Sequence, residues 1–114
     1  MEKLRFFLVD DDRIFIKRLS RILDPIAQEV ISTTTATDAV SSILETRPDC
    51  VLLDLMMPGA DGLQILKQLR SYESLQSLTI IMVTHEPDMA DYAERLIWMV
   101  DGRIERDTRK SKAA

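Results

Sequence analysis

The chain has 114 residues, the usual length of one domain. Its 46% of hydrophobic and 30% of charged residues are typical of globular proteins and exclude a disordered chain. A net charge of −4 argues against non-specific binding to nucleic acid or to an anionic membrane. One cysteine and one histidine exclude an internal disulfide and make a cysteine- or histidine-based metal site an unfavoured interpretation.

The distribution of apolar residues points to a location inside the cell. No apolar run reaches the roughly 18 residues that a membrane-spanning helix needs. Residues 1–5 lead directly into a short strand-like run and lack the apolar core of a signal peptide. We therefore expect a cytoplasmic protein without a membrane partner.

The hydrophobic pattern alternates between strands and helices. In chain order it predicts a strand at residues 6–9, a helix at 14–23, a strand at 30–34, a helix from 37 or 38 to about 46, a strand at 50–53, a helix at 63–69, a strand at 79–84, a helix from 87 to about 95 and a strand at 96–100. Asp101-Gly102 predicts a hairpin turn before a short strand at 103–106, and the tail beyond it is charged and expected to fray.

Alternating strands and helices favour an α/β fold with helices on both faces of a mostly parallel sheet. We predict the flavodoxin-like strand order 2-1-3-4-5, with the hairpin adding an antiparallel sixth strand at the edge. The whole chain, residues 1–114, is expected to form a single domain.

Aspartates stand at the ends of two strands that should be neighbours. Asp10, Asp11 and Asp12 follow the first strand, and Asp54 follows the third. In a parallel sheet, function gathers beyond the carboxyl ends of the strands. Carboxylates brought together there repel one another unless a cation is present, and Mg²⁺ prefers such oxygen ligands. Asp12 either joins this cluster or caps the first helix.

Two stretches carry a family resemblance. Residues 7–12 read FLVDDD, and residues 51–62 read VLLDLMMPGADG. Both resemble the receiver domain of bacterial two-component response regulators, and the resemblance covers residues 1 to about 84. It implies that Asp54 accepts a phosphoryl group. It also implies that Asp10, Asp11, Asp54 and the backbone carbonyl of Met56 bind Mg²⁺, weakly here, and that Thr84 donates a hydrogen bond to the phosphoryl oxygen.

The final third departs from the receiver pattern. A receiver continues with a fifth strand that ends in Lys-Pro and with a long last helix. Here the fifth strand ends in Val100-Asp101-Gly102, so that Asp101 stands about where the lysine is expected. Without the last helix, we expect apolar residues of the first helix to be partly uncovered and a homodimer to form at high concentration: Ile14, Ile16, Leu19, Ile22 and Leu23.

Residues 81–104, IMVTHEPDMADYAERLIWMVDGRI, resemble a different family. They are similar to the C-terminal end of ABC-transporter ATPase subunits, over residues 79–107. The resemblance implies that His85 corresponds to the histidine that contacts the ATP γ-phosphate; alternatively, it is a histidine at a strand end. With three glycines the chain cannot contain a phosphate-binding P-loop, so we expect no nucleotide binding.

These resemblances leave several functions open. One is an engineered chimera, receiver-like over residues 1–78 and ATPase-tail-like over 79–107, with a frayed tail at 108–114 and a vestigial site without physiological activity. The alternative is a working phospho-accepting receiver of a phosphorelay, with a kinase that the sequence does not identify. A nucleotide-binding ATPase is the third. We expect no enzyme activity and no nucleic-acid partner.

Overall fold

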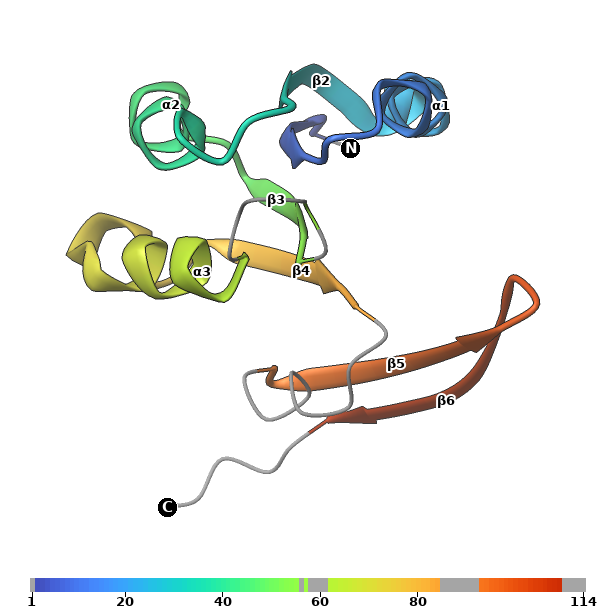
Figure 1. The fold of residues 1–114 in the computed structure, drawn as a ribbon. Coiled ribbons are helices and arrows are strands. Elements are labelled where there is room, and N and C mark those ends of the chain that lie inside the picture. The colour runs from blue at the N-terminus through green and yellow to red at the C-terminus, as the bar shows by residue number, and fades with distance from the viewer. Residues whose placement is uncertain (1, 56, 58–61, 85–92, 110–114) are drawn as a thin grey trace. The chain divides into compact units, whose positions relative to one another are not determined.

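A computed structural model describes residues 2–55, 57, 62–84 and 93–109 of the chain (Figure 1). It divides into two compact units, Met1–Val83 and Thr84–Ala114. Each unit contains a sheet of its own: four strands in the first and two in the second. The two compact units do not test whether the chain folds as the predicted single domain, nor the boundaries predicted within it.

The first unit is built on a parallel sheet with the strand order β2-β1-β3-β4. Its strands are β1 (Leu4–Val9), β2 (Ala27–Thr33), β3 (Cys50–Asp54) and β4 (Thr79–Val83). In the register, Val9 lies opposite both Thr33 and Leu53, and Asp54 lies opposite Val83. The carboxyl ends of the strands therefore meet at one edge of the sheet, as the sequence predicts.

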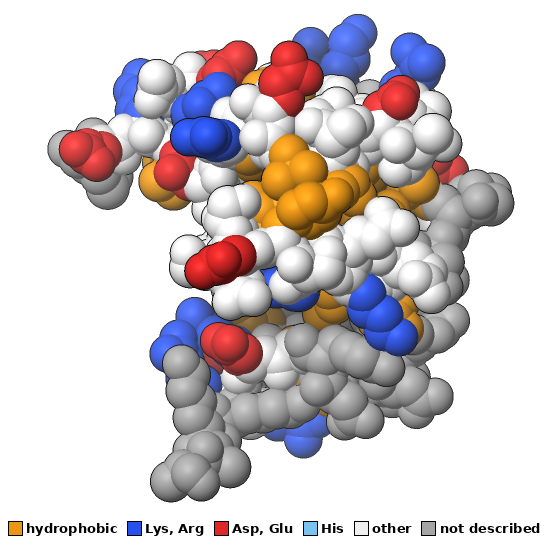
Figure 2. Space-filling model, turned by 90° about the vertical axis from the view of Figure 1, so that its left-hand side faces the viewer, with side chains coloured by type: hydrophobic (Ala, Val, Ile, Leu, Met, Phe, Trp, Pro, Cys, Tyr) orange, Lys and Arg blue, Asp and Glu red, His pale blue; other side chains and the backbone are white. Residues whose placement is uncertain are grey.

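Helices cover both faces of this sheet, because its side chains alternate between two apolar clusters. Phe7, Val9, Val51 and Leu53 point to the face covered by α2 (Ala39–Thr46) and α3 (Gly62–Ser71). Half-buried side chains of these two helices border this cluster, and Figure 2 shows hydrophobic groups at the surface on this side.

The opposite face of the sheet carries one helix. Phe6, Leu8 and Cys50 pack there against Ile16 of α1 (Arg13–Leu23). Short 3₁₀ turns, η1 (Asp24–Ile26) and η2 (Glu73–Leu75), lead into β2 and β4. Ile16 is buried, which corrects the expectation that it is uncovered, whereas Ile14 and Ile22 are exposed. No helix in the described part of the chain has the length and apolar character needed to span a membrane.

Asp12 is the N-cap residue of α1. Its Oδ1 accepts hydrogen bonds from the backbone N–H groups of Ile14, at 3.0 Å, and Phe15, at 3.1 Å. These are two of the donors that the first turn of a helix leaves without partners. Of the two interpretations of Asp12, the helix cap is the one observed.

Gly62 allows α3 to start close to the end of β3. A Cβ atom added at Gly62 would lie 2.7 Å from the Cα of Leu55 and 2.5 Å from its Cδ2. Because the nearer obstacles include backbone, no side chain fits there without a shift of the chain. The glycine therefore permits the short path from Asp54 to the helix.

The second unit is a hairpin of β5 (Arg95–Val100) and β6 (Arg103–Arg109). Asp101 and Gly102 form its turn with φ values of 50° and 76°, as expected for the Asp-Gly pair. β6 extends three residues beyond the predicted end at 106, since Asp107 pairs with Ile97 in the ladder and the side chain of Arg95 bonds to the carboxylate of Asp107. The strand thus enters the segment expected to fray.

The predicted strand order is confirmed for its first four positions. The expected fifth position was wrong for the described residues, because β5 pairs with β6 in a separate sheet and not with β4. β2 begins at Ala27, three residues earlier than predicted, because the turn η1, which contains Pro25, is complete at Ile26. The predicted helix from 87 to 95 falls largely outside the described residues.

Candidate functional site

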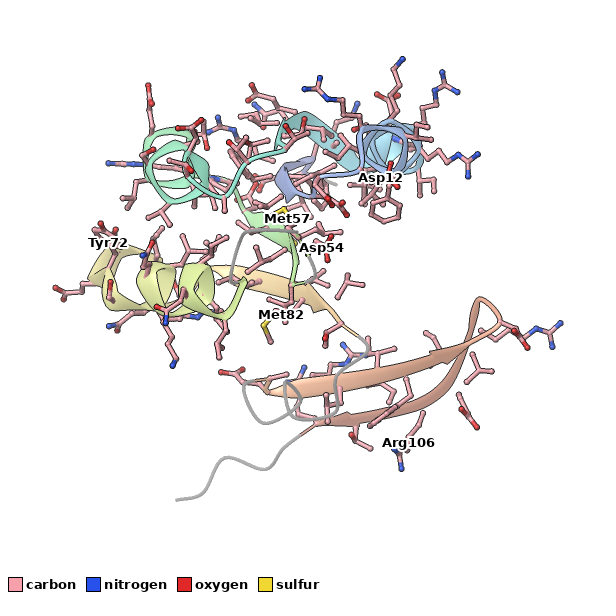
Figure 3. All side chains as sticks on the ribbon, viewed as in Figure 1. Asp12, Asp54, Met57, Tyr72, Met82 and Arg106 are labelled. Carbon is pink, nitrogen blue, oxygen red and sulfur yellow. The ribbon has the colours of Figure 1, made fainter. Side chains whose placement is uncertain are left out.

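Three of the predicted site residues come together at the carboxyl edge of the first sheet. Asp10 and Asp11 follow β1, and Asp54 is the last residue of β3. A carboxylate oxygen from each of the three lies within 4.8 Å of the other two. Figure 3 labels Asp54 at the end of β3 and Asp12 at the start of α1. The carboxylate of Asp12 caps the helix α1, so Asp12 contacts this cluster through its backbone N–H.

Backbone contacts hold the loop that carries Asp10. The N–H of Asp10 donates to the carbonyl oxygen of Thr33 at 3.2 Å, which extends the pairing of β1 with β2 by one residue. The N–H of Asp12 donates to Oδ1 of Asp10 at 2.9 Å. The first contact joins two main-chain groups, and the second joins a main-chain N–H to the carboxylate of Asp10. Thr33 was not predicted from the sequence as part of the site, because any residue supplies a carbonyl.

The cluster disfavours negative charge. The pKa of Asp10 is raised, first by desolvation and then by the charges of Asp54 and Asp11 and a side-chain hydrogen bond with Asp54. The bond from the N–H of Asp12 acts in the opposite direction. Three carboxylates so close together are therefore poised to take up either a proton or a cation.

The donor set fits Mg²⁺. Magnesium takes one or two carboxylates together with water molecules, and the cluster is half-exposed, with Asp11 open to solvent. Asp10, Asp11 and Asp54 are the residues that would hold the ion. The fourth predicted ligand, the carbonyl of Met56, lies outside the described residues. Its neighbour Met57 is buried in the apolar core.

A small cavity lies beside the acidic cluster. Its volume is about 30 Å³, and Asp10 and Asp54 line it together with apolar side chains of β3, β4 and α1, among them Leu52, Val83 and Phe15. A space of this size holds about one water molecule. Asp10 thus has apolar surroundings on the side of the core, which is the physical source of its desolvation.

The structure describes only some of the remaining predicted residues. Thr84 is half-buried and directly follows β4, whose last residue Val83 pairs with Asp54. His85 lies outside the described residues. Asp101, at the position where the lysine was expected, occupies the turn of the β5–β6 hairpin.

Comparison with known proteins identifies a family. The model of the response regulator receiver domain matches residues 6–112. The response regulator MprA of Mycobacterium sp. (strain KMS) is 35% identical over 88 residues, which are 77% of this chain and 37% of that protein. The DNA-binding response regulator MtrA of Mycobacterium tuberculosis (strain ATCC 25618 / H37Rv) is 33% identical over 87 residues, 76% of this chain and 37% of that protein. The chain thus spans little more than a third of these relatives.

Solved structures agree on the fold. The chemotaxis response regulator CheY4 of Vibrio cholerae superimposes with a TM-score of 0.69 at 22% identity, over 78% of this chain and 74% of that one. A putative response regulator from Chloroflexus aurantiacus J-10-fl gives a TM-score of 0.69 at 27% identity, over 79% and 74% of the two chains.

The family match bears on the predicted fusion. It runs through residues 79–107, the segment that resembles an ABC-transporter ATPase, so the comparisons do not support a second origin or an engineered junction. The family match does explain why an acidic cluster lies at the edge of a flavodoxin-like sheet with the strand order 2-1-3-4. The chain belongs to the response regulator receiver domain family.

Proposed function

We propose that the chain is a phospho-accepting receiver in which Asp54 takes up a phosphoryl group beside a bound Mg²⁺. The observation that carries the proposal is the meeting of Asp10, Asp11 and Asp54 within 4.8 Å at the carboxyl edge of the sheet. Asp54 is the acceptor because it ends the central strand β3. Asp10 and Asp11, with the carbonyl of Met56, are the further metal ligands.

The reaction is a transfer of a phosphoryl group between two oxygen or nitrogen nucleophiles. A carboxylate oxygen of Asp54 forms a bond to phosphorus while the bond from phosphorus to the donor's leaving group breaks, and the leaving group departs with its electron pair. Mg²⁺ supplies neutralisation of the phosphoryl oxygens when it is bound. The Thr84 hydroxyl donates a hydrogen bond to one of those oxygens.

We expect this transfer to be slow. The family places a lysine at the end of the fifth strand, whereas this chain has Val100-Asp101-Gly102 there. The described residues supply no lysine at that position to share the new negative charge with the metal. Every loss of about 1.4 kcal/mol in transition-state stabilisation lowers the rate tenfold.

The donor fits the known chemistry of the family. We propose a histidine kinase as the physiological source of phosphate and a cytoplasmic setting, with the chain acting as a signalling domain and not as an enzyme with a turnover substrate. DNA binding, named for the relative MtrA, is not proposed for these residues, whose net charge is −4.

Self-association is a further part of the proposal. Ile14 and Ile22 of α1 are 67% and 71% exposed. Apolar surface of this kind favours contact between copies at high protein concentration. Light scattering at rising concentration tests this, and a monomeric mass at millimolar protein contradicts it.

Phosphorylation is tested with acetyl phosphate and Mg²⁺, read by intact mass. We expect a gain of one phosphoryl group over a period longer than minutes, no gain without Mg²⁺, and no gain in Asp54→Asn. Asp24→Asn is the matched control, because it removes an exposed carboxylate at the far end of α1. Modification of Asp54→Asn equal to that of the unchanged protein contradicts the proposal.

The second candidate is a vestigial site that binds Mg²⁺ without accepting phosphate. The carboxylate of Asp101 in place of a cation at the end of β5 favours it. It is also the form that the chimera hypothesis predicts. A protein that gains thermal stability from Mg²⁺ but stays unmodified after prolonged incubation with acetyl phosphate supports this second candidate.

A further inference from the structure

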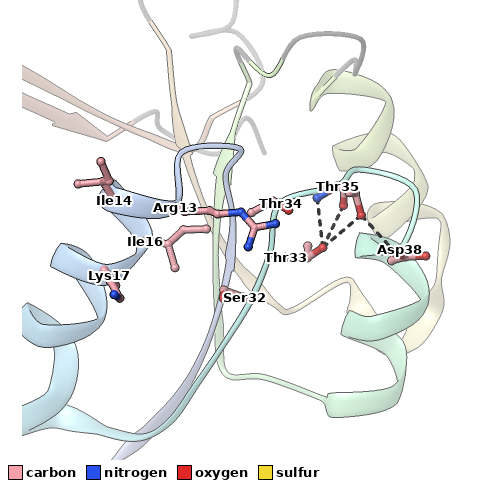
Figure 4. A pocket seen from close by; sticks show the side chains of 9 residues that line it. All are labelled: Arg13, Ile14, Ile16, Lys17, Ser32, Thr33, Thr34, Thr35 and Asp38. Carbon is pink, nitrogen blue, oxygen red and sulfur yellow. Dashed lines mark hydrogen bonds between the residues drawn. The ribbon is translucent and has the colours of Figure 1, made fainter.

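A second, open cavity has none of the three clustered aspartates in its lining, although its lining residue Thr33 accepts the hydrogen bond from the N–H of Asp10. It has a volume of about 710 Å³ and opens between the first turns of α1 and the end of β2 (Figure 4). We call it the α1–β2 cleft. Small-molecule sites in proteins have volumes of about 300–1,000 Å³. Its lining consists of two cations, four consecutive hydroxyl residues, two isoleucines and one acid: Arg13, Ile14, Ile16, Lys17, Ser32, Thr33, Thr34, Thr35 and Asp38.

One wall of the cleft is positively charged. Arg13 and Lys17 are four residues apart in α1 and therefore lie on the same side of the helix. No ion pair or hydrogen bond engages either side chain within the described residues, whereas Arg5 pairs with Glu29 at 3.1 Å. In Figure 4 the Arg13 guanidinium extends from α1 toward Thr33 and Thr34. An acidic chain thus presents to one open cavity two cations that have no ion pair among the described residues.

The opposite wall offers hydroxyl groups. Ser32 and the three threonines that follow it form the end of β2 and the start of the next loop. Thr33 Oγ1 accepts from the N–H of Thr35 at 3.2 Å, and the hydroxyl of Thr35 donates to Oδ2 of Asp38 at 3.3 Å. These bonds fix the orientation of the wall. Among the described residues, the hydroxyl groups of Ser32 and Thr34 make no hydrogen bond. Asp38 is the single acid among the described lining residues.

We propose that the α1–β2 cleft binds a small organic phosphate, a phosphate monoester of a sugar or nucleoside. The planar guanidinium of Arg13 and the ammonium of Lys17 bind the phosphate oxygens. The hydroxyl groups of Ser32 and Thr34 donate hydrogen bonds to the hydroxyl groups of the ester or accept them, and the carboxylate of Asp38 accepts them. The proposal does not depend on the phosphorylation of Asp54.

Binding is measured by calorimetry with ribose 5-phosphate and with inorganic phosphate, in the absence of Mg²⁺ and on both the unchanged protein and Asp54→Asn. We expect saturable binding of ribose 5-phosphate, equal in the two proteins and roughly tenfold tighter than that of inorganic phosphate, because the ester gains further hydrogen bonds. Absence of saturable binding at millimolar ligand overturns the proposal.

Two double variants separate a site from general electrostatics. Arg13→Gln with Lys17→Gln removes the cleft's cations, and we expect at least a roughly tenfold loss of affinity for ribose 5-phosphate. Arg18→Gln with Arg21→Gln removes the same charge from exposed positions of α1 outside the cleft lining, and we expect a loss of less than about threefold. Equal losses in the two variants overturn the proposal. Circular dichroism confirms that both remain folded.

Asp38→Ala separates the ester from the free anion. Loss of the negative charge favours both phosphates, whereas loss of the carboxylate acceptor acts against ribose 5-phosphate alone, so we expect the roughly tenfold preference for the ester to shrink. An unchanged ratio of the two affinities contradicts the placement of the sugar hydroxyls. Tighter binding of a phosphoserine peptide than of ribose 5-phosphate overturns the proposal in favour of a protein partner.

Discussion

The two units of the chain are stabilised in different ways. In Met1–Val83, the side chains of Phe7, Val9 and Leu53 are completely buried between the parallel sheet and its helices. Among the residues of Thr84–Ala114 whose exposure is described, by contrast, none is buried, and every residue of β6 is exposed. Long-range packing of apolar groups supports the first unit, whereas local contacts across one hairpin support the second.

The local contacts of the hairpin can be named. Arg95 donates through Nε to Oδ1 of Asp107 at 2.9 Å, and the guanidinium of Arg106 lies 4.6 Å from the ring centre of Trp98. A two-stranded hairpin is marginally stable by itself in water. The comparison teaches that the acidic cluster rests on the more stable of the two units, since Asp10, Asp11 and Asp54 all belong to the first.

The largest effect is expected in the core of the first unit. Leu53→Ala removes a fully buried side chain from β3 and should lower the free energy of unfolding by about 2–5 kcal/mol. The same kind of truncation in the hairpin, Ile97→Ala, affects a side chain that is 49% exposed and should cost less than about 1 kcal/mol. Urea unfolding measures both costs, followed by far-UV circular dichroism for Leu53→Ala and by Trp98 fluorescence for Ile97→Ala. Similar costs contradict the contrast between the units.

The next effect concerns the close approach at Gly62. Gly62→Ala places a methyl group against Leu55, including its backbone, and should destabilise the first unit by roughly 1–3 kcal/mol. Ser41→Ala, at an exposed position of α2, is the control and should change stability by less than about 0.5 kcal/mol. A stable Gly62→Ala protein in thermal unfolding contradicts the close contact.

Metal binding should stabilise the first unit by a smaller amount. At a concentration of Mg²⁺ ten times the dissociation constant, mass action adds about 1.4 kcal/mol to the free energy of unfolding. The midpoint of thermal unfolding should therefore rise with Mg²⁺ in the unchanged protein and in Asp24→Asn, but not in Asp10→Asn. An unchanged midpoint in the folded protein contradicts the metal site.

The pH dependence of this effect follows from the raised pKa of Asp10. Without metal, the contribution of Asp10 to stability is fully present below its unfolded pKa near 3.8 and is lost as the pH rises through its folded pKa. Asp10→Asn should therefore raise the midpoint of the metal-free protein at pH 7. Mg²⁺ needs the ionised cluster, so its stabilising effect should fade as the pH decreases through the same window. A metal effect that is constant across this window contradicts the assignment.

The smallest effect concerns the hairpin. Arg106→Ala removes the cation that lies over Trp98 and should reduce the stability of the hairpin by about 0.5–1 kcal/mol. Trp98 is the one tryptophan of the chain, so its fluorescence reports on the hairpin, while far-UV circular dichroism is dominated by the first unit. We expect the unfolding transition seen by Trp98 fluorescence to shift and the transition seen by far-UV circular dichroism to stay unchanged. A common shift of both signals contradicts separate stabilisation.

Local patterns in the sequence determined most of the first unit. The spacing of Ile16, Leu19 and Leu23 determines a helix with one apolar side, and its start at Asp12 follows from capping chemistry. The Asp-Gly pair determines the hairpin turn, because both residues tolerate positive φ values. The meeting of Asp10 and Asp54 follows from adjacent parallel strands, whose carboxyl ends lie at the same edge.

Other features were decided by the tertiary structure. The strand β5 has the apolar pattern of a buried strand, yet it pairs with β6 and not with β4, because strand pairing depends on contacts between distant segments and not on local preference. The α1–β2 cleft likewise requires the distance and direction at which α1 packs on β2. The sequence indicates which residues favour burial and which are charged, whereas only the packing decides which distant surfaces face one another.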